Sequence, residues 1–125
     1  MIFGVGIDLV EVSRIRKALQ TEGFAARVFT AAERAYCDNK QRGKAASYAA
    51  RFAGKEAFVK ALGVGLRAGR LTDISIENDA AGQPFITLSG RYSAMIKERK
   101  ITGIHISISH TREWAMAEVI LEAQS

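Results

Sequence analysis

The sequence predicts an α+β fold in which an antiparallel sheet packs against one long central helix. Three stretches support this fold class: an alternating segment at 2–10, a nearly all-apolar segment at 48–62, and strand patterns from residue 72 onward. Alternation with a period of two indicates strands, and a segment that is apolar all round indicates a buried helix.

The size and composition favour one globular domain spanning residues 1–125. Hydrophobic residues make up 48% and charged residues 25%, which is an ordinary balance for a packed protein. No apolar run approaches the ~20 residues that cross a bilayer, and the N-terminus lacks the basic segment of a signal peptide. A single cysteine, Cys37, excludes an internal disulfide and a cysteine-built zinc site. We therefore expect a cytoplasmic protein with no membrane partner.

The net charge of +5 indicates an anionic partner. Nucleic acid, a phosphorylated small molecule and an acidic protein all satisfy this condition, and charge alone does not choose among them.

The first expected strand, 2–10, has two different faces. Gly4 and Gly6 share one face with Asp8 and leave space there for a ligand or another backbone. The other face is apolar and consists of Phe3, Val5, Ile7 and Leu9. Asp8 has two interpretations at this point: a capping pair with Glu11 that opens the next helix, or a metal ligand.

Two helices are expected next. Residues 11–20 form an amphipathic helix that stops before Gly23, and Thr30 with Glu33 forms a capping box for a helix over 31–40. A basic patch with one aromatic residue lies in this region, comprising Arg14, Arg16, Lys17, Phe24 and Arg27. Such a patch is either a solvated face or a surface that grips an acidic helix of another protein.

The central helix follows the polar connector 41–47 and ends at Gly63. Its i, i+4 stripe ends with Glu56 and Lys60, so Lys60 is one candidate partner for a buried Glu56 carboxylate. The other interpretation is that Glu56 and Asp8 together hold a metal ion.

The loop 63–71 contains three glycines, Arg67 and Arg70, a weak phosphate signal that lacks the P-loop pattern. Strands at 73–78 and 84–90 flank a hairpin turn at 79–82, and Ser89 caps a helix that runs to about residue 100. A strand ending at His110, a turn at 111–113 and a largely buried strand at 114–121 complete the chain.

Two chemistries compete for these residues. A Ser–His hydrolase built from Ser107, Ser109 and His110 is poorly supported, because no G-x-S-x-G elbow is present and adjacent strand residues point to opposite faces. Metal-assisted phosphoryl transfer would use Asp8 and Glu56 as Mg²⁺ ligands. The cations available to neutralise phosphates are Lys55, Lys60, Arg67 and Arg70.

Three segments in order resemble the holo-[acyl-carrier-protein] synthase family, the small 4'-phosphopantetheinyl transferases. They are GIDLVEVSRI at 6–15, RFAGKEAFVKALGVG at 51–65 and ISISHTREWA at 106–115. The resemblance covers essentially the whole chain and implies a 4'-phosphopantetheinyl transferase-like fold. The hairpin at 81–84 departs from the family's usual Asn-Gly-Lys-Pro, and nothing is carried over for the connector 38–47.

The resemblance implies Mg²⁺-dependent transfer of 4'-phosphopantetheine from coenzyme A to a serine of apo-acyl carrier protein, in support of fatty acid biosynthesis. The product released is adenosine 3',5'-bisphosphate. By position, Asp8 and Glu56 match the metal ligands and Lys60 matches a pyrophosphate contact, and we expect these three to be catalytic. Glu56 and a metal-bound water both stay open as the acceptor of the serine proton.

The resemblance also implies binding surfaces. The positions near the nucleotide are Arg51, Gly63, Gly65, His110 and Thr111, and those that receive the carrier protein are Arg14, Ile15, Phe24 and Arg27. Family members are trimers with each site between two subunits, so His110 is expected to act opposite the neighbour's acids.

Two other functions are weaker alternatives. A small RNA-binding protein could use the same arginines, but no aromatic RNP-type string is present, so no nucleic-acid partner is expected. An inactive, carrier-binding relative is disfavoured by the intact set of Asp8, Glu56 and Lys60.

Overall fold

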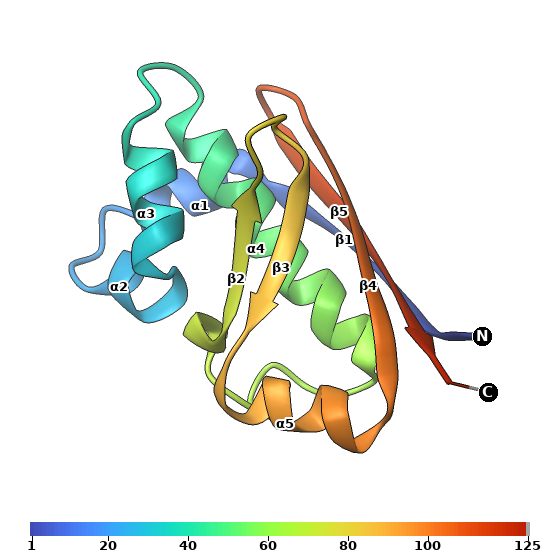
Figure 1. The fold of residues 1–125 in the computed structure, drawn as a ribbon. Coiled ribbons are helices and arrows are strands. Elements are labelled where there is room, and N and C mark those ends of the chain that lie inside the picture. The colour runs from blue at the N-terminus through green and yellow to red at the C-terminus, as the bar shows by residue number, and fades with distance from the viewer. Residues whose placement is uncertain (125) are drawn as a thin grey trace.

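The computed structural model describes residues 1–124, and its α+β architecture confirms the expected fold class (Figure 1). In chain order the elements are β1 (Ile2–Glu11), α1 (Val12–Ala18), α2 (Phe24–Val28), α3 (Ala31–Asp38), α4 (Lys44–Leu62), η1 (Leu71–Asp73), β2 (Ile74–Asn78), β3 (Pro84–Leu88), α5 (Gly90–Glu98), β4 (Ile101–His110) and β5 (Trp114–Ala123). None of the helices in the described part is long and apolar enough to cross a membrane.

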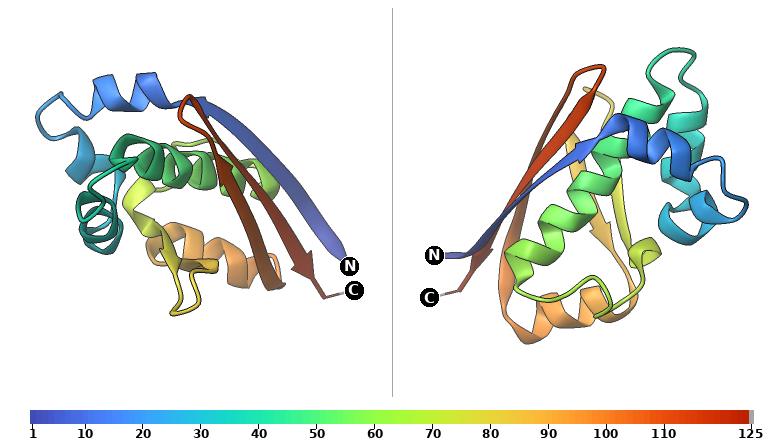
Figure 2. Two further views of the ribbon diagram at one scale, coloured as in Figure 1. Left: turned by 90° about the horizontal axis from the view of Figure 1, so that it is seen from above. Right: turned by 180° about the vertical axis from the view of Figure 1, so that it is seen from behind.

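Helix α4 is the centre of the molecule. It crosses one face of a three-stranded antiparallel sheet of order β1-β5-β4, and the β2–β3 hairpin packs beside it (Figure 2). Its apolar positions are buried, with Ala53, Ala57 and Phe58 fully inaccessible to solvent. The helix begins at Lys44, four residues before the predicted start, and it ends where Gly63 adopts a left-handed φ of 82°.

Two glycines allow β1 to lie directly against α4. A Cβ atom added at Gly4 would stand 1.9 Å from the carbonyl oxygen of Ala61, and one at Gly6 would stand 1.9 Å from that of Ala57. No side chain fits at either distance, so the expectation that another backbone approaches this face is confirmed. The close approach places Asp8, on the same face of β1, beside α4.

The opposite face of the sheet is open. We call it the outer face; its large apolar side chains are between 41% and 58% exposed and comprise Phe3, Val5, Ile7, Leu9, Trp114 and Met116. The prediction that β5 is largely buried is therefore wrong for three alternate residues, Trp114, Met116 and Glu118, which are exposed. Helix α4 covers the other face of this sheet, so side chains that alternate toward the outer face stay partly exposed among residues 1–124.

A buried ion pair ties α4 to the rest of the core. The Lys55 ammonium lies 2.8 Å from Glu33 Oε1, with both side chains at 0% exposure, and it also donates to the carbonyls of Leu71 and Ile74. Burial lowers the Lys55 pKa, and the Glu33 charge opposes that shift. The expectation that Lys55 neutralises phosphates is wrong, because its donors are committed to the interior.

Glu33 also completes the predicted capping box of α3. Its backbone N–H donates to Thr30 Oγ1 at 3.2 Å, and its carboxylate accepts from the Thr30 N–H at 2.8 Å. Ser89 occupies the predicted N-cap position of α5, but its hydroxyl donates to Asp73 instead of capping the helix.

Candidate active site

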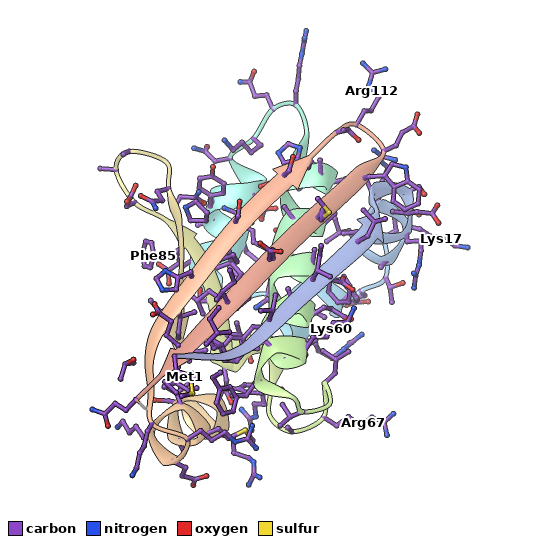
Figure 3. All side chains as sticks on the ribbon, turned by 90° about the vertical axis from the view of Figure 1, so that its right-hand side faces the viewer. Met1, Lys17, Lys60, Arg67, Phe85 and Arg112 are labelled. Carbon is purple, nitrogen blue, oxygen red and sulfur yellow. The ribbon has the colours of Figure 1, made fainter. Side chains whose placement is uncertain are left out.

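Asp8 and Lys60 form the first contact of the site. Lys60, near the end of α4, donates to Asp8 Oδ1 at 3.0 Å and to the Ile7 carbonyl at 3.0 Å. Figure 3 shows Lys60 beside β1, whereas Arg67 extends into solvent from the loop after α4. The alternative in which Asp8 forms a capping pair is wrong, because Glu11 is the N-cap residue of α1 and no side chain caps it.

Glu56 lies in the same cleft as Asp8. The cleft has a volume of about 290 Å³ between β1, α1 and α4, and we call it the acidic cleft; its lining is Asp8, Leu9, Val10, Arg14, Ile15, Ala18, Phe24, Phe52 and Glu56. Lys60 forms its ion pair with Asp8, and within residues 1–124 the Glu56 carboxylate has neither a hydrogen bond nor an ion pair. The interpretation of Lys60 as the ion-pair partner of Glu56 is therefore wrong.

The electrostatics of Glu56 reflect burial next to a like charge. Burial raises the Glu56 pKa, and the neighbouring Asp8 carboxylate raises it further, while Lys60 and Arg14 act in the opposite direction. Two partly buried carboxylates that line one cleft gain stability from a cation placed between them.

The donor set fits Mg²⁺ better than a structural transition-metal ion. No group of three or more His, Cys, Asp or Glu side chains is arranged for a metal in the described part of the chain. Zinc sites use three or four such ligands, whereas Mg²⁺ typically takes one or two protein carboxylates and completes its shell with water and substrate phosphate. Asp8 and Glu56 supply that number of carboxylates.

The predicted carrier-protein residues border the acidic cleft. Arg14 and Phe24 line it, with Arg14 exposed and Phe24 half-buried, and Arg27 is exposed on the neighbouring α2. Ile15 is only 5% exposed and packs into the core, so it supports α1 from below rather than offering contact area.

A second cleft lies on the other side of α4. It has a volume of about 300 Å³, and we call it the basic cleft; its lining is Tyr36, Lys40, Arg42, Gly43, Ser47, Ala50, Arg51, Asn78, Gly82, Pro84, Ile108 and His110. It shares no residue with the acidic cleft. The structure thus places Arg51 and His110 together, as expected, and adds five polar residues that sequence reasoning missed: Tyr36, Lys40, Arg42, Ser47 and Asn78.

Arg51 is a buried cation that forms no ion pair with a carboxylate of residues 1–124. It is 5% exposed; Nη1 lies 3.4 Å from the carbonyl oxygen and the hydroxyl of Ser47, and Nη2 donates to Asn78 Oδ1. Nε is buried with no hydrogen-bond partner in the described residues. Because a buried charge without a counter-ion is unfavourable, this arrangement suits an anionic ligand.

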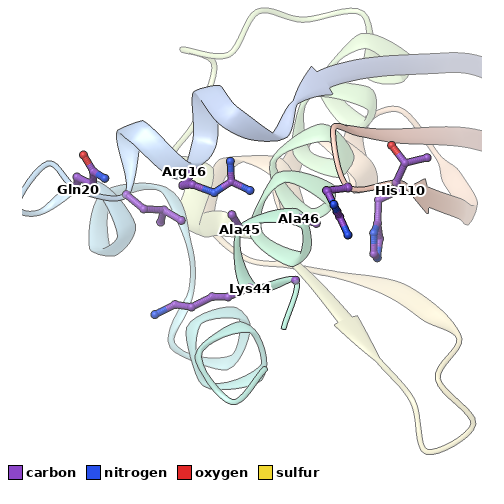
Figure 4. Close-up of a pocket in the computed structure, with 10 residues that line it drawn as sticks. Arg16, Gln20, Lys44, Ala45, Ala46 and His110 are labelled. Atoms are coloured by element: carbon purple, nitrogen blue, oxygen red, sulfur yellow. The ribbon is translucent and has the colours of Figure 1, made fainter. Parts of the chain in front are cut away.

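The remaining predicted nucleotide residues lie elsewhere. Thr111 shares with His110 a wider cavity of about 850 Å³ between α1 and the start of α4, shown in Figure 4. Its hydroxyl accepts from the backbone N–H groups of Glu113 and Trp114, and so closes the β4–β5 turn. Lys44 points away from His110 in Figure 4 and pairs with Asp38 at 3.3 Å. Gly63 and Gly65 follow the opposite end of α4.

Comparison with known proteins supplies independent findings. Residues 4–119 match the model of the 4'-phosphopantetheinyl transferase superfamily. The holo-[acyl-carrier-protein] synthase of Trichlorobacter lovleyi is 50% identical, with 98% of this chain and 99% of the relative covered. That of Treponema denticola is 46% identical, with the same coverage of 98% and 99%.

Solved structures agree with these relatives. The holo-(acyl-carrier-protein) synthase of Bacillus anthracis, in complex with CoA (3',5'-ADP), is similar with a TM-score of 0.83, 36% identity and 99% of each chain covered. The enzyme from Neisseria meningitidis gives a TM-score of 0.88 at 34% identity, covering 98% of this chain and 99% of its own.

Proposed function

This chain belongs to the 4'-phosphopantetheinyl transferase superfamily, and on that premise we propose that it is a holo-[acyl-carrier-protein] synthase. It transfers 4'-phosphopantetheine from coenzyme A to a serine of apo-acyl carrier protein and releases adenosine 3',5'-bisphosphate. The observation that carries the proposal is the placement of Asp8 and Glu56 in one cleft with Lys60 beside them.

The acidic cleft performs the chemistry. Asp8 and Glu56 would hold Mg²⁺, which when bound would supply positive charge to stabilise the pyrophosphate during transfer. Lys60, already oriented by its hydrogen bonds to Asp8 and Ile7, adds a second positive charge at the same place.

The attacking group is the carrier serine. Its oxygen bonds to the phosphorus that bears the pantetheine arm, and the bisphosphate leaves with the bridging oxygen. Asp8 is engaged by Lys60, whereas Glu56 has no hydrogen-bond partner in the described residues, so Glu56 is the carboxylate able to accept the serine proton.

The basic cleft binds the nucleotide portion of coenzyme A. Arg51, Arg42 and Lys40 surround a space next to His110 and supply the charge that a phosphate group requires. Since the pyrophosphate is held in the acidic cleft, the phosphate bound here is the 3'-phosphate. The proposal also assigns contacts with other parts of coenzyme A to the glycines of the 63–65 turn and to Thr111.

The carrier protein docks beside the acidic cleft. Arg14 and Arg27 are exposed there and Phe24 offers apolar contact, which suits an acidic helix with an apolar stripe. Ile15 holds α1 in place under this surface.

The two clefts combine in a homotrimer, in which the acidic cleft of one subunit meets the basic cleft of its neighbour. Two features support this assembly: the clefts share no residue within one chain, and the apolar outer face is uncovered. Exposed apolar area of this extent is characteristic of a protein–protein interface.

We further propose that residues 1–125 act as one catalytic domain in the cytoplasm and supply holo-carrier protein for fatty acid biosynthesis. No membrane or nucleic-acid partner is required by this role.

Intact-protein mass spectrometry tests the reaction. Apo-acyl carrier protein is incubated with the protein, coenzyme A and Mg²⁺, and we expect a mass gain of one phosphopantetheine that disappears with EDTA. A known transferase serves as the positive control for the carrier. No gain under conditions in which that control reacts would refute the proposal.

A further inference from the structure

In the basic cleft, the aromatic ring of Tyr36 contacts two cations. Its centroid is 4.2 Å from Arg51 Cζ and 4.6 Å from Lys40 Nζ. A cation over an aromatic face within about 6 Å of the centroid is attracted by the ring's negative face. Tyr36 belongs to α3, Arg51 to α4, and Lys40 to the connector between those helices. One ring therefore fixes the relative positions of two cations from different segments.

Arg51 keeps unused donor capacity in this arrangement. A guanidinium has five N–H donors. Nη1 contacts the two oxygens of Ser47, Nη2 donates to Asn78, and Nε has no partner in the described part of the chain. The Nε–Nη2 edge is the side of a guanidinium that forms paired hydrogen bonds with two oxygens of a phosphate. The ring of Tyr36 lies against the guanidinium, with its centroid 4.2 Å from Cζ, and restricts the movement of the group.

The ring also contacts Lys40, the exposed cation of the pair. Its side chain is exposed, and within residues 1–124 it forms no ion pair with a carboxylate. A free lysine loses rotamer entropy when a ligand fixes it, so a contact that orders the side chain beforehand reduces the cost of binding.

We propose that Tyr36 is a positioning residue for the 3'-phosphate of coenzyme A, acting through Arg51 and Lys40. It touches no reacting atom, and its contribution is to binding rather than to chemistry. This inference rests on the proposed function, because that function assigns the pyrophosphate to the acidic cleft and leaves the 3'-phosphate for the basic cleft.

Binding of two nucleotides tests the inference without requiring turnover. Isothermal titration calorimetry compares adenosine 3',5'-bisphosphate with adenosine 5'-monophosphate, which lacks the 3'-phosphate. Tyr36→Leu should weaken binding of the bisphosphate about fivefold and leave binding of the monophosphate unchanged. Tyr36→Phe keeps the ring and should bind both nucleotides like the wild type, which makes it the matched control.

Kinetics supply the second measurement. With Tyr36→Leu, the KM for coenzyme A should rise by a similar factor while kcat and the KM for 3'-dephospho-coenzyme A stay unchanged. An equal loss for ligands with and without the 3'-phosphate, a Phe variant as weak as the Leu variant, or no loss with Leu would each overturn the inference. A wild-type protein that binds neither nucleotide would overturn it as well. Wild-type binding of the bisphosphate without phosphopantetheine transfer would instead count against the proposed function.

Discussion

The two clefts on either side of α4 carry opposite charge imbalances. In the acidic cleft, Glu56 has no cationic partner in the described residues and its pKa is raised by burial and by Asp8. In the basic cleft, Arg51 is buried, and no carboxylate in the described part of the chain pairs with it. Within the described residues, the acidic cleft lacks a cation paired with Glu56, and the basic cleft lacks an anion paired with Arg51.

This difference indicates that the acidic cleft serves the chemical step and the basic cleft serves nucleotide binding. A pair of carboxylates suits a divalent cation and proton transfer, whereas a cluster of fixed cations suits binding of a phosphate that does not react. Substitutions in the acidic cleft should therefore reduce the rate of chemistry, and substitutions in the basic cleft should weaken nucleotide binding.

The largest effect should come from the carboxylates. Asp8→Ala or Glu56→Ala should lower kcat by roughly 10³-fold or more, because the cation that stabilises the pyrophosphate is no longer held. Transfer is measured by the mass of the carrier protein, and far-ultraviolet circular dichroism checks that the fold is retained. Either variant working at a near-normal rate would contradict the assignment of the metal ligands.

Arg51→Ala should have the next largest effect, raising the KM for coenzyme A about 10-fold or more through loss of the buried guanidinium.

A mixture of Arg51→Ala and Asp8→Ala chains tests whether the two clefts of one site come from different subunits. If each site combines two subunits, co-expression of the Arg51→Ala and Asp8→Ala chains in equal amounts should give about a quarter of the sites wild-type affinity and activity at a coenzyme A concentration well below the raised KM, because half of the acidic clefts and half of their basic partners are intact. No recovery in purified mixed assemblies would place both clefts of one site in the same chain.

The two carboxylates of the acidic cleft could be predicted from the sequence, whereas most polar residues of the basic cleft could not. Asp8 lies on a regular strand and Glu56 on a regular helix, so periodicity predicts the face on which each side chain lies. Gly4 and Gly6 indicate that the strand and the helix approach closely. Resemblance to a family then led to the prediction that the pair holds a metal ion.

The missed residues belong to irregular or distant segments. Lys40 and Arg42 lie in the connector before α4, and Asn78 lies at the end of β2, where no local pattern indicates which side chains will meet Arg51. The buried Lys55–Glu33 pair was also missed, since a lysine in a helix gives no sign of burial until its partner on another helix is known.

A charged substitution on the outer face should disrupt the proposed trimer. Ile7→Glu places a charge among apolar side chains that are 41% to 58% exposed in one chain, and it should convert the trimer to smaller species with a loss of transfer activity. Phe85→Glu is the matched control, because Phe85 is 41% exposed on β3, outside the outer face. Size-exclusion chromatography with light scattering measures the mass. A trimer that persists in Ile7→Glu, or is lost equally in the control, would place the interface elsewhere.

The smallest effect should be the dependence of stability on pH in metal-free protein. A carboxyl group whose pKa is higher in the folded state binds protons more tightly there, so stability falls as pH rises from the ordinary glutamate pKa through the raised value. Glu56→Gln removes this titration, and its Tm should exceed that of the wild type by an amount that grows across that interval and then levels off. Thermal melts in EDTA measure the difference, and added Mg²⁺ should reduce it, because a bound cation favours the ionised carboxylate. A difference that does not change with pH would show that the Glu56 carboxyl does not titrate with a raised pKa in the folded protein.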